Sequence, residues 1–76
     1  MKELIEYIAK SLASNPGEVD VTEISDGDGQ VTLRLECAGE DKGKIIGRQG
    51  RLAQSMRILL RVRAVKEDVR VNLEIV

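Results

Sequence analysis

Two segments that alternate strictly between apolar and polar residues constrain the fold of this chain more than any other feature. They span residues 30 to 37 and 69 to 75. The apolar positions of the first segment are Val31, Leu33, Leu35 and Cys37, and those of the second are Val69, Val71, Leu73 and Ile75. A period of two is typical of strands with one buried and one solvated face. The rest of the chain must therefore cover a single side of a sheet.

Three helices predicted from the spacing of apolar residues can cover that side of the sheet. Residues 2 to 13 predict an amphipathic helix, which Asn15-Pro16-Gly17 should end. Its apolar face is predicted to hold Leu4, Ile5, Ile8, Ala9 and Leu12. A short helix over about residues 40 to 46 and a long one over about 51 to 66 are also predicted.

Residues 19 to 25 predict one further strand. Val19 and Val21 alternate with polar residues, whereas Ile24 falls out of phase, which we attribute to a β-bulge. The turn Asp26-Gly27-Asp28-Gly29 would join this strand to residues 30 to 37 in a hairpin.

The order helix, strand, strand, helix, helix, strand (α-β-β-α-α-β) fixes the topology. A crossover through two helices makes the last two strands parallel. We therefore predict one domain over residues 1–76, of the α+β class. Its three-stranded mixed sheet should carry all three helices on one face.

Positive charge is confined to one segment. The chain has a net charge of −1, yet residues 42 to 66 contain eight cations and no carboxylate, while residues 1 to 41 contain three cations and ten carboxylates. Such a segregated basic run is typical of polyanion binding.

A corner bracketed by glycines, Gly47-Arg48-Gln49-Gly50, lies inside this run, with Lys44 and Arg51 on either side. Glycines permit positive φ and close approach of a ligand to the backbone. The corner leads into a predicted helix N-terminus, whose amides favour an anion. A plain bend between helices fits the same spacing, but the charge run favours nucleic acid.

The pattern Ile45-Ile46-Gly47-Arg48-Gln49-Gly50 between two helices resembles the signature of KH domains. The element order resembles the type II, bacterial form, and the whole chain is similar to the small single-domain KH proteins of the KH-domain RNA-binding protein A family. The resemblance implies a loop that clamps the backbone of about four unpaired nucleotides.

The same resemblance implies an RNA-binding surface made of the corner and its flanks. Carried onto this sequence, it comprises Lys44, Ile45, Ile46, Gly47, Arg48, Gln49, Gly50, Arg51, Leu52, Ala53 and Gln54. Ile45, Ile46, Leu52 and Ala53 would form the apolar floor on which bases rest. Gln54 stands where related sequences often have lysine, which should weaken phosphate attraction.

The long helix is apolar on two sides. Its core face is predicted to comprise Leu52, Ala53, Met56, Leu59, Leu60 and Ala64. Ile58, Val62 and Val65 form a second stripe on roughly the opposite side. This stripe fits either a contact with another subunit or burial beneath the first helix. The family resemblance implies pairing with itself or with another KH-containing protein.

Few residues suited to catalysis or metal binding are present. There is no histidine and one cysteine, Cys37, which we predict to be buried. We therefore expect no enzyme, no cofactor and no metal site. Asp26-Gly27-Asp28-Gly29 lacks the end ligands of a calcium loop, and Tyr7, the only aromatic residue, lies off the core face of its helix.

We also expect no membrane segment and a cytoplasmic location. The predicted function is single-stranded RNA binding without catalysis, in post-transcriptional regulation or RNA chaperoning, by a homodimer or a heterodimer. The alternative is a protein-interaction module in which RNA contact is secondary or lost.

Overall fold

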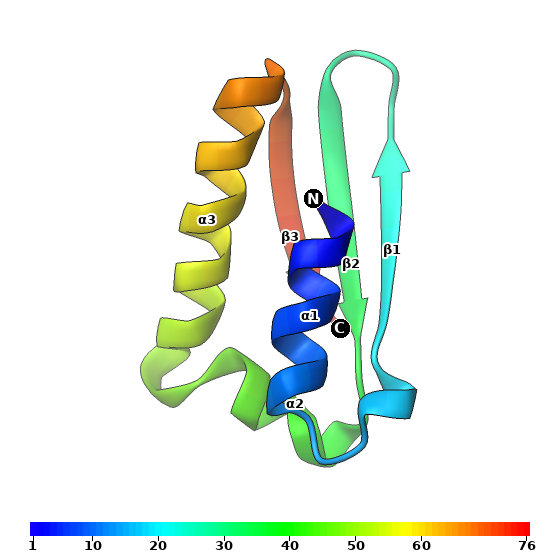
Figure 1. Cartoon of the computed structure of the whole chain (residues 1–76), viewed down its shortest axis with the longest axis vertical. Helices are drawn as coiled ribbons and strands as arrows, with labels where there is room; N and C mark the ends of the chain where they lie inside the picture. The colour runs from blue at the N-terminus through cyan, green and yellow to red at the C-terminus, as the bar shows by residue number, and fades with distance from the viewer.

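The computed structural model describes residues 1–76 and has the predicted order of elements (Figure 1). The helices are α1 (Lys2–Leu12), α2 (Gly39–Ile46) and α3 (Arg51–Glu67), and the strands are β1 (Asp20–Ser25), β2 (Gln30–Glu36) and β3 (Arg70–Ile75). Short 3-10 turns, η1 (Pro16–Glu18) and η2 (Arg48–Gly50), precede β1 and α3. None of the helices combines the length and the apolarity that crossing a membrane requires.

The three strands form one mixed sheet in the order β1-β2-β3. β1 and β2 pair antiparallel as the predicted hairpin. β2 and β3 pair parallel, with Leu33 opposite Leu73. The two alternating segments therefore place their apolar residues on the same face, because partners in register share a side of the sheet. This confirms the predicted α+β fold.

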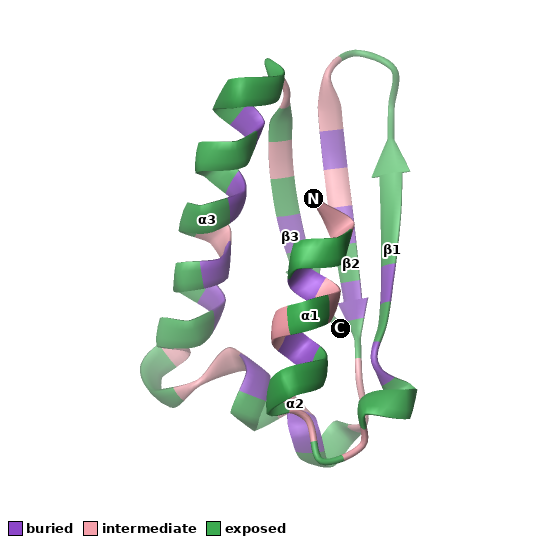
Figure 2. Ribbon diagram, in the orientation of Figure 1, coloured by how far each residue is buried: buried purple, intermediate pink, exposed green.

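All three helices contribute to the core on that face (Figure 2). The largest buried apolar side chains are Ile5 of α1, Ile45 of α2, Met56 and Leu60 of α3, and Leu33 and Leu35 of β2. The opposite face carries the polar residues of the strands, such as Arg34 opposite Glu74. The sheet thus has one covered and one open side.

The predicted β-bulge at Ile24 is wrong. The register of β1 on β2 runs without interruption, and Ile24 pairs with Thr32 on the open face of the sheet, where it is 50% exposed. Its phase differs because it belongs to the solvated side of the strand. Cys37 is half-buried against the core, somewhat less covered than predicted.

Some leucines predicted to lie in the core are a third or more exposed. They are Leu4 and Leu12 of α1 and Leu52 and Leu59 of α3. The two helices make little direct contact, because each packs mainly on the sheet or on α2. Residues on the flanks of the two helices, such as Leu59 of α3, are consequently left partly uncovered.

Candidate nucleic-acid interface

The corner between α2 and α3 has the backbone of a glycine-dependent turn. Gly47 has φ 82° and Gly50 has φ 73°. Gln49, which is not a glycine, also takes a left-handed conformation at φ 57°, ψ 26°. A left-handed residue with a side chain is unfavourable by about 1–2 kcal/mol. Such strain persists where the surrounding structure imposes it, often at ligand sites.

The two glycines are required for different reasons. A Cβ on Gly47 would lie 2.8 Å from Cβ of Leu52 and 2.9 Å from its backbone nitrogen. No atom lies within 4 Å of a Cβ built on Gly50. Gly47 therefore lets the corner close against the first turn of α3, whereas Gly50 leaves an open approach to the backbone from solvent.

Two backbone donors at the corner are free. The N–H of Gly50 donates to the carbonyl of Gly47 at 3.1 Å. Arg48 and Gln49 are the first two residues of η2, where a helix leaves its N–H groups without an intrahelical acceptor, and no side chain caps them. Arg48 has a negative φ and Gln49 a positive one. Successive N–H groups in such an alternation converge on an anion-sized hollow. The corner can therefore donate two hydrogen bonds to a phosphate.

The cations on the corner are also available. Arg48 and Arg51 are exposed, and neither forms an ion pair with a carboxylate. One guanidinium nitrogen of Arg51 donates to Oε1 of Gln49 at 3.4 Å. These two arginines, with the free amides, give the corner an uncompensated positive field.

Lys44, which is predicted to belong to the RNA-binding surface, has its ammonium engaged within the protein. Nζ donates to Oγ of Ser14 and lies 3.8 Å from Oδ1 of Asp41. Asp41 is fully buried and accepts the backbone N–H groups of Ser14 at 3.0 Å and Asn15 at 2.9 Å. These hydrogen bonds, with a smaller contribution from Lys44, hold the pKa of Asp41 below its ordinary value. The network ties the end of α1 to α2.

The four apolar residues predicted as a groove floor divide into two pairs. Ile45 and Ala53 are buried, so they support the corner from below. Leu52 is 37% exposed and Ile46 is half-buried, so they present apolar surface beside the corner. Gln54 is exposed on the first turn of α3.

A groove that the sequence did not reveal lies between the middle of α3 and the edge strand β3. Its lining includes Arg57, Leu60, Arg61, Val71, Asn72 and Leu73. Arg57 donates to the carbonyl of Leu73 at 3.4 Å across the groove. The spacing of Arg57 and Arg61, one helical turn apart, already indicates in the sequence that the two side chains share one face of the helix. Their partner strand is known only once β3 is placed.

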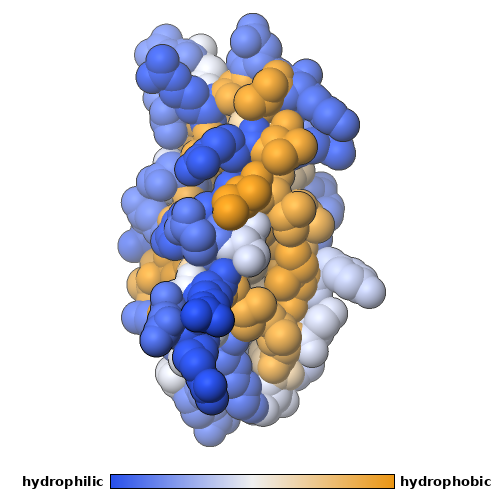
Figure 3. All heavy atoms as spheres, turned by 90° about the vertical axis from the view of Figure 1, so that its left-hand side faces the viewer, coloured by the Kyte–Doolittle hydropathy of each residue, from blue (hydrophilic) through white to orange (hydrophobic).

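The second stripe of α3 lies on the surface, so its burial beneath α1 is excluded. Ile58, Val62 and Val65 are 49%, 55% and 75% exposed. Figure 3 shows apolar side chains gathered in a long band on the side of the molecule that α3 occupies, with hydrophilic side chains beside it. Single exposed apolar residues are ordinary, but a continuous band is typical of an interaction surface.

Comparisons with known proteins agree with this architecture. The family model described as KhpA/KhpB, KH domain, matches residues 2–75. The RNA-binding protein KhpA of Clostridium acetobutylicum is 49% identical over 76 residues, which span 100% of both chains. The protein of that name from Caldanaerobacter subterraneus subsp. tengcongensis is 47% identical over 76 residues, again 100% of both chains. That of Treponema pallidum is 48% identical over 75 residues, covering 99% of this chain and 92% of the relative.

Proposed function

Because the chain belongs to the KhpA/KhpB family of KH domains, we propose that it binds single-stranded RNA through the corner Gly47–Gly50 and catalyses no reaction. The observation that carries this proposal is the pair of free N–H groups on Arg48 and Gln49, next to two unpaired arginines. The name of the relatives, RNA-binding protein KhpA, supports RNA as the ligand.

The proposed contact divides between backbone and bases. A phosphate accepts the amides of Arg48 and Gln49 and is held by charge from Arg48 and Arg51. Bases then enter the groove between α3 and β3, with Leu60 at its floor and Arg57 and Arg61 on its wall. Unpaired bases can stack on guanidinium planes, which suits a protein whose only aromatic residue, Tyr7, lies elsewhere on α1.

We propose that two copies pair through the exposed stripe of α3. A helix that presents Ile58, Val62 and Val65 to solvent can bury them against the same stripe of a second copy in a two-fold contact. Pairing would join two weak sites and raise avidity for one RNA strand. Such a dimer fits a cytoplasmic protein of post-transcriptional regulation or RNA chaperoning. A second KH-containing protein is the other candidate partner.

RNA binding is tested by fluorescence anisotropy with a short single-stranded RNA at a series of salt concentrations. If the corner and its neighbours neutralise three or so phosphates, the logarithm of the affinity should fall against the logarithm of salt with a slope of about −2. A duplex of the same sequence should bind more weakly. Affinity that does not change with salt would contradict phosphate clamping.

The alternative function, a protein-interaction module with secondary or no RNA contact, is favoured by the same exposed stripe. Sedimentation velocity of the wild type and of Val62→Glu separates the two functions. We expect a dimer that the charge disrupts, with RNA binding per subunit retained. A monomer in both cases would contradict self-pairing, and a dimer that binds no RNA would favour the alternative.

A further inference from the structure

Two further hollows lie beyond the proposed base-binding groove between α3 and β3. A second hollow, lined by Arg61, Val65, Val69, Arg70 and Val71 among others, shares Arg61 and Val71 with the first. A third hollow shares Val69 and Arg70 with the second and opens at the β1–β2 turn. The three hollows therefore lie next to one another, in a path from the middle of α3 to its C-terminal end.

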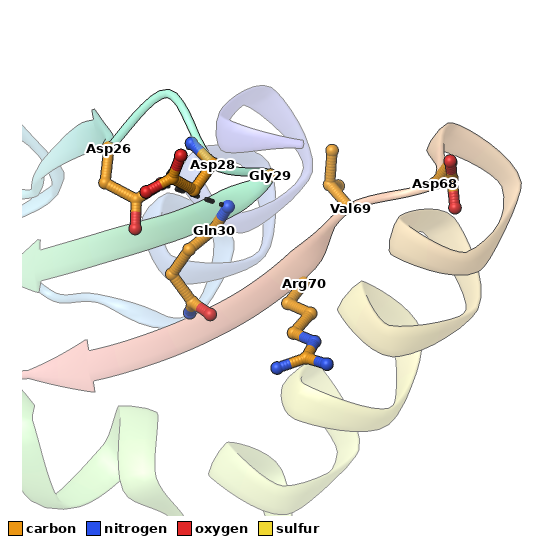
Figure 4. Close-up of a pocket in the computed structure, with 7 residues that line it drawn as sticks. All are labelled: Asp26, Asp28, Gly29, Gln30, Asp68, Val69 and Arg70. Atoms are coloured by element: carbon orange, nitrogen blue, oxygen red, sulfur yellow. Dashed lines mark hydrogen bonds between the residues drawn. The ribbon is translucent and has the colours of Figure 1, made fainter.

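The sign of the charge reverses along this path. Arg57, Arg61 and Arg70 line its first two parts. The third part is lined by three carboxylates, Asp26 and Asp28 from the β1–β2 turn and Asp68 from the α3–β3 turn. Figure 4 shows Arg70 pointing away from both turns, toward α3. Arg70 also lines the third hollow, which therefore carries three carboxylates against one cation.

The carboxylates at the far end are not neutralised. None of the three forms an ion pair with a cation. Oδ1 of Asp26 accepts the N–H groups of Asp28 at 2.8 Å and Gln30 at 3.3 Å, so these donors are unavailable to a ligand. An anion that arrived here would meet negative charge within the screening length of about 10 Å and find those two amides occupied.

We propose that Asp26, Asp28 and Asp68 form an electrostatic barrier that limits how many nucleotides the groove accepts. This inference rests on the proposed RNA-binding function. The strand enters at the corner, follows Arg57 and Arg61 for roughly 15 Å of helix, and leaves the surface before the hairpin turn. The three carboxylates do not bind a ligand. They set the length of RNA that the domain holds.

The barrier is tested with fluorescein-labelled oligouridines of about four to about twelve nucleotides, on the wild type and on D26N/D28N/D68N. Asparagine can accept the hydrogen bonds that Asp26 accepts, and it tolerates the left-handed backbone of Asp68 (φ 56°). We expect the wild-type affinity and salt slope to stop changing with length once the groove is filled. In D26N/D28N/D68N, the slope of log affinity against log salt should steepen by about 0.7 for each further phosphate bound.

A matched control carries the same loss of three negative charges on the other edge strand, as E18Q/D20N/E23Q. These exposed residues lie on or beside β1, which β2 separates from β3. The control should keep the wild-type dependence on length. If it behaves like D26N/D28N/D68N, or if that variant levels off at the wild-type length, the barrier is refuted while RNA binding stands. A wild type that binds no oligouridine overturns the proposed function itself. Asp68→Asn alone should show a smaller change in the same direction.

Discussion

Two turns of this protein contain paired glycines with positive φ, and they differ in where their backbone donors go. In Asp26–Gly29, Gly27 and Gly29 have φ 84° and 81°, and the Asp26 carboxylate accepts two N–H groups of the turn region. In Gly47–Gly50, φ is 82° and 73° at the glycines, and no side chain accepts the first two N–H groups of η2. A carboxylate thus engages part of the first turn's donors, whereas no side chain engages the donors of the corner.

The comparison shows that the same spacing of positive-φ glycines occurs in two turns of different chemistry. The difference lies in the side chains within each turn. A short carboxylate closes an Asx-type turn on its own backbone, whereas Arg48 and Gln49 are long and reach outward to solvent. The surrounding charge follows the same division, with an acidic hairpin at one end of α3 and a basic corner at the other.

The largest difference in stability should come from the glycines themselves. Gly47→Ala creates a 2.8 Å contact with Leu52 as well as an unfavourable φ, so we expect a loss of about 2–4 kcal/mol. Gly50→Ala and Gly27→Ala have open space and should each lose only about 1 kcal/mol. Urea unfolding of the three variants measures this. Equal losses would show that steric closure against α3 does not distinguish Gly47.

Asp41 provides the next test. Its carboxylate accepts backbone N–H groups from a distant segment of the chain, whereas that of Asp26 accepts them within its own turn region. The folded carboxylate has a lowered pKa, chiefly because Ser14 and Asn15 donate backbone hydrogen bonds to it. Its contribution to the free energy of unfolding is complete above the ordinary aspartate pKa of about 3.9 and declines as pH falls toward the lower folded value.

Asp41→Asn should therefore lower the urea midpoint at neutral pH. The free energy of unfolding of this variant should also fall less steeply with acid than that of the wild type. Asp26→Asn, on an exposed turn, should have a smaller effect at neutral pH. A decline with acid that is the same in Asp41→Asn and the wild type would contradict the assigned role of this carboxylate.

The smallest expected effect is that of Gln49→Gly, a variant that keeps the backbone of the corner and removes one of its side chains. Gln49→Gly removes the left-handed strain at φ 57° but adds the entropy of a glycine, so stability should change by less than about 1 kcal/mol. The backbone donors remain, and RNA affinity should fall by less than about tenfold, the value of one hydrogen bond. Complete loss of binding in an anisotropy titration would assign the clamp to the side chain instead.

Much of the fold could be predicted because its signals are local. The alternation in residues 30 to 37 and 69 to 75 fixed two strands and their buried face, and the intervening helices fixed their parallel pairing. Ile24 was misjudged because one out-of-phase residue looks the same whether it marks a bulge or the solvated face. The exposure of Leu59 depends on how α1 and α3 are spaced, which periodicity does not encode.

The candidate site was only partly predictable for the same reason. Gly47 to Gly50 form a contiguous signal, and so does the charge run. The engagement of Lys44 depends on Ser14, 30 residues earlier in the chain, and the groove depends on β3 lying beside α3. Neither contact leaves a trace in local sequence. The exposure of Ile58, Val62 and Val65 likewise required the packing of α1 to be known.

The central claim is that the free amides and cations of the corner hold the RNA backbone, and one comparison of variants tests it most directly. R48D/Q49D places two carboxylates at the corner, while K10E/S11E makes the same change in net charge on the exposed end of α1. Anisotropy titration with one single-stranded RNA should show at least about a hundredfold loss for the first, since two charge-assisted contacts are removed. The second should bind nearly as the wild type does. Equal affinities for the two variants, both folded by circular dichroism, would contradict the account.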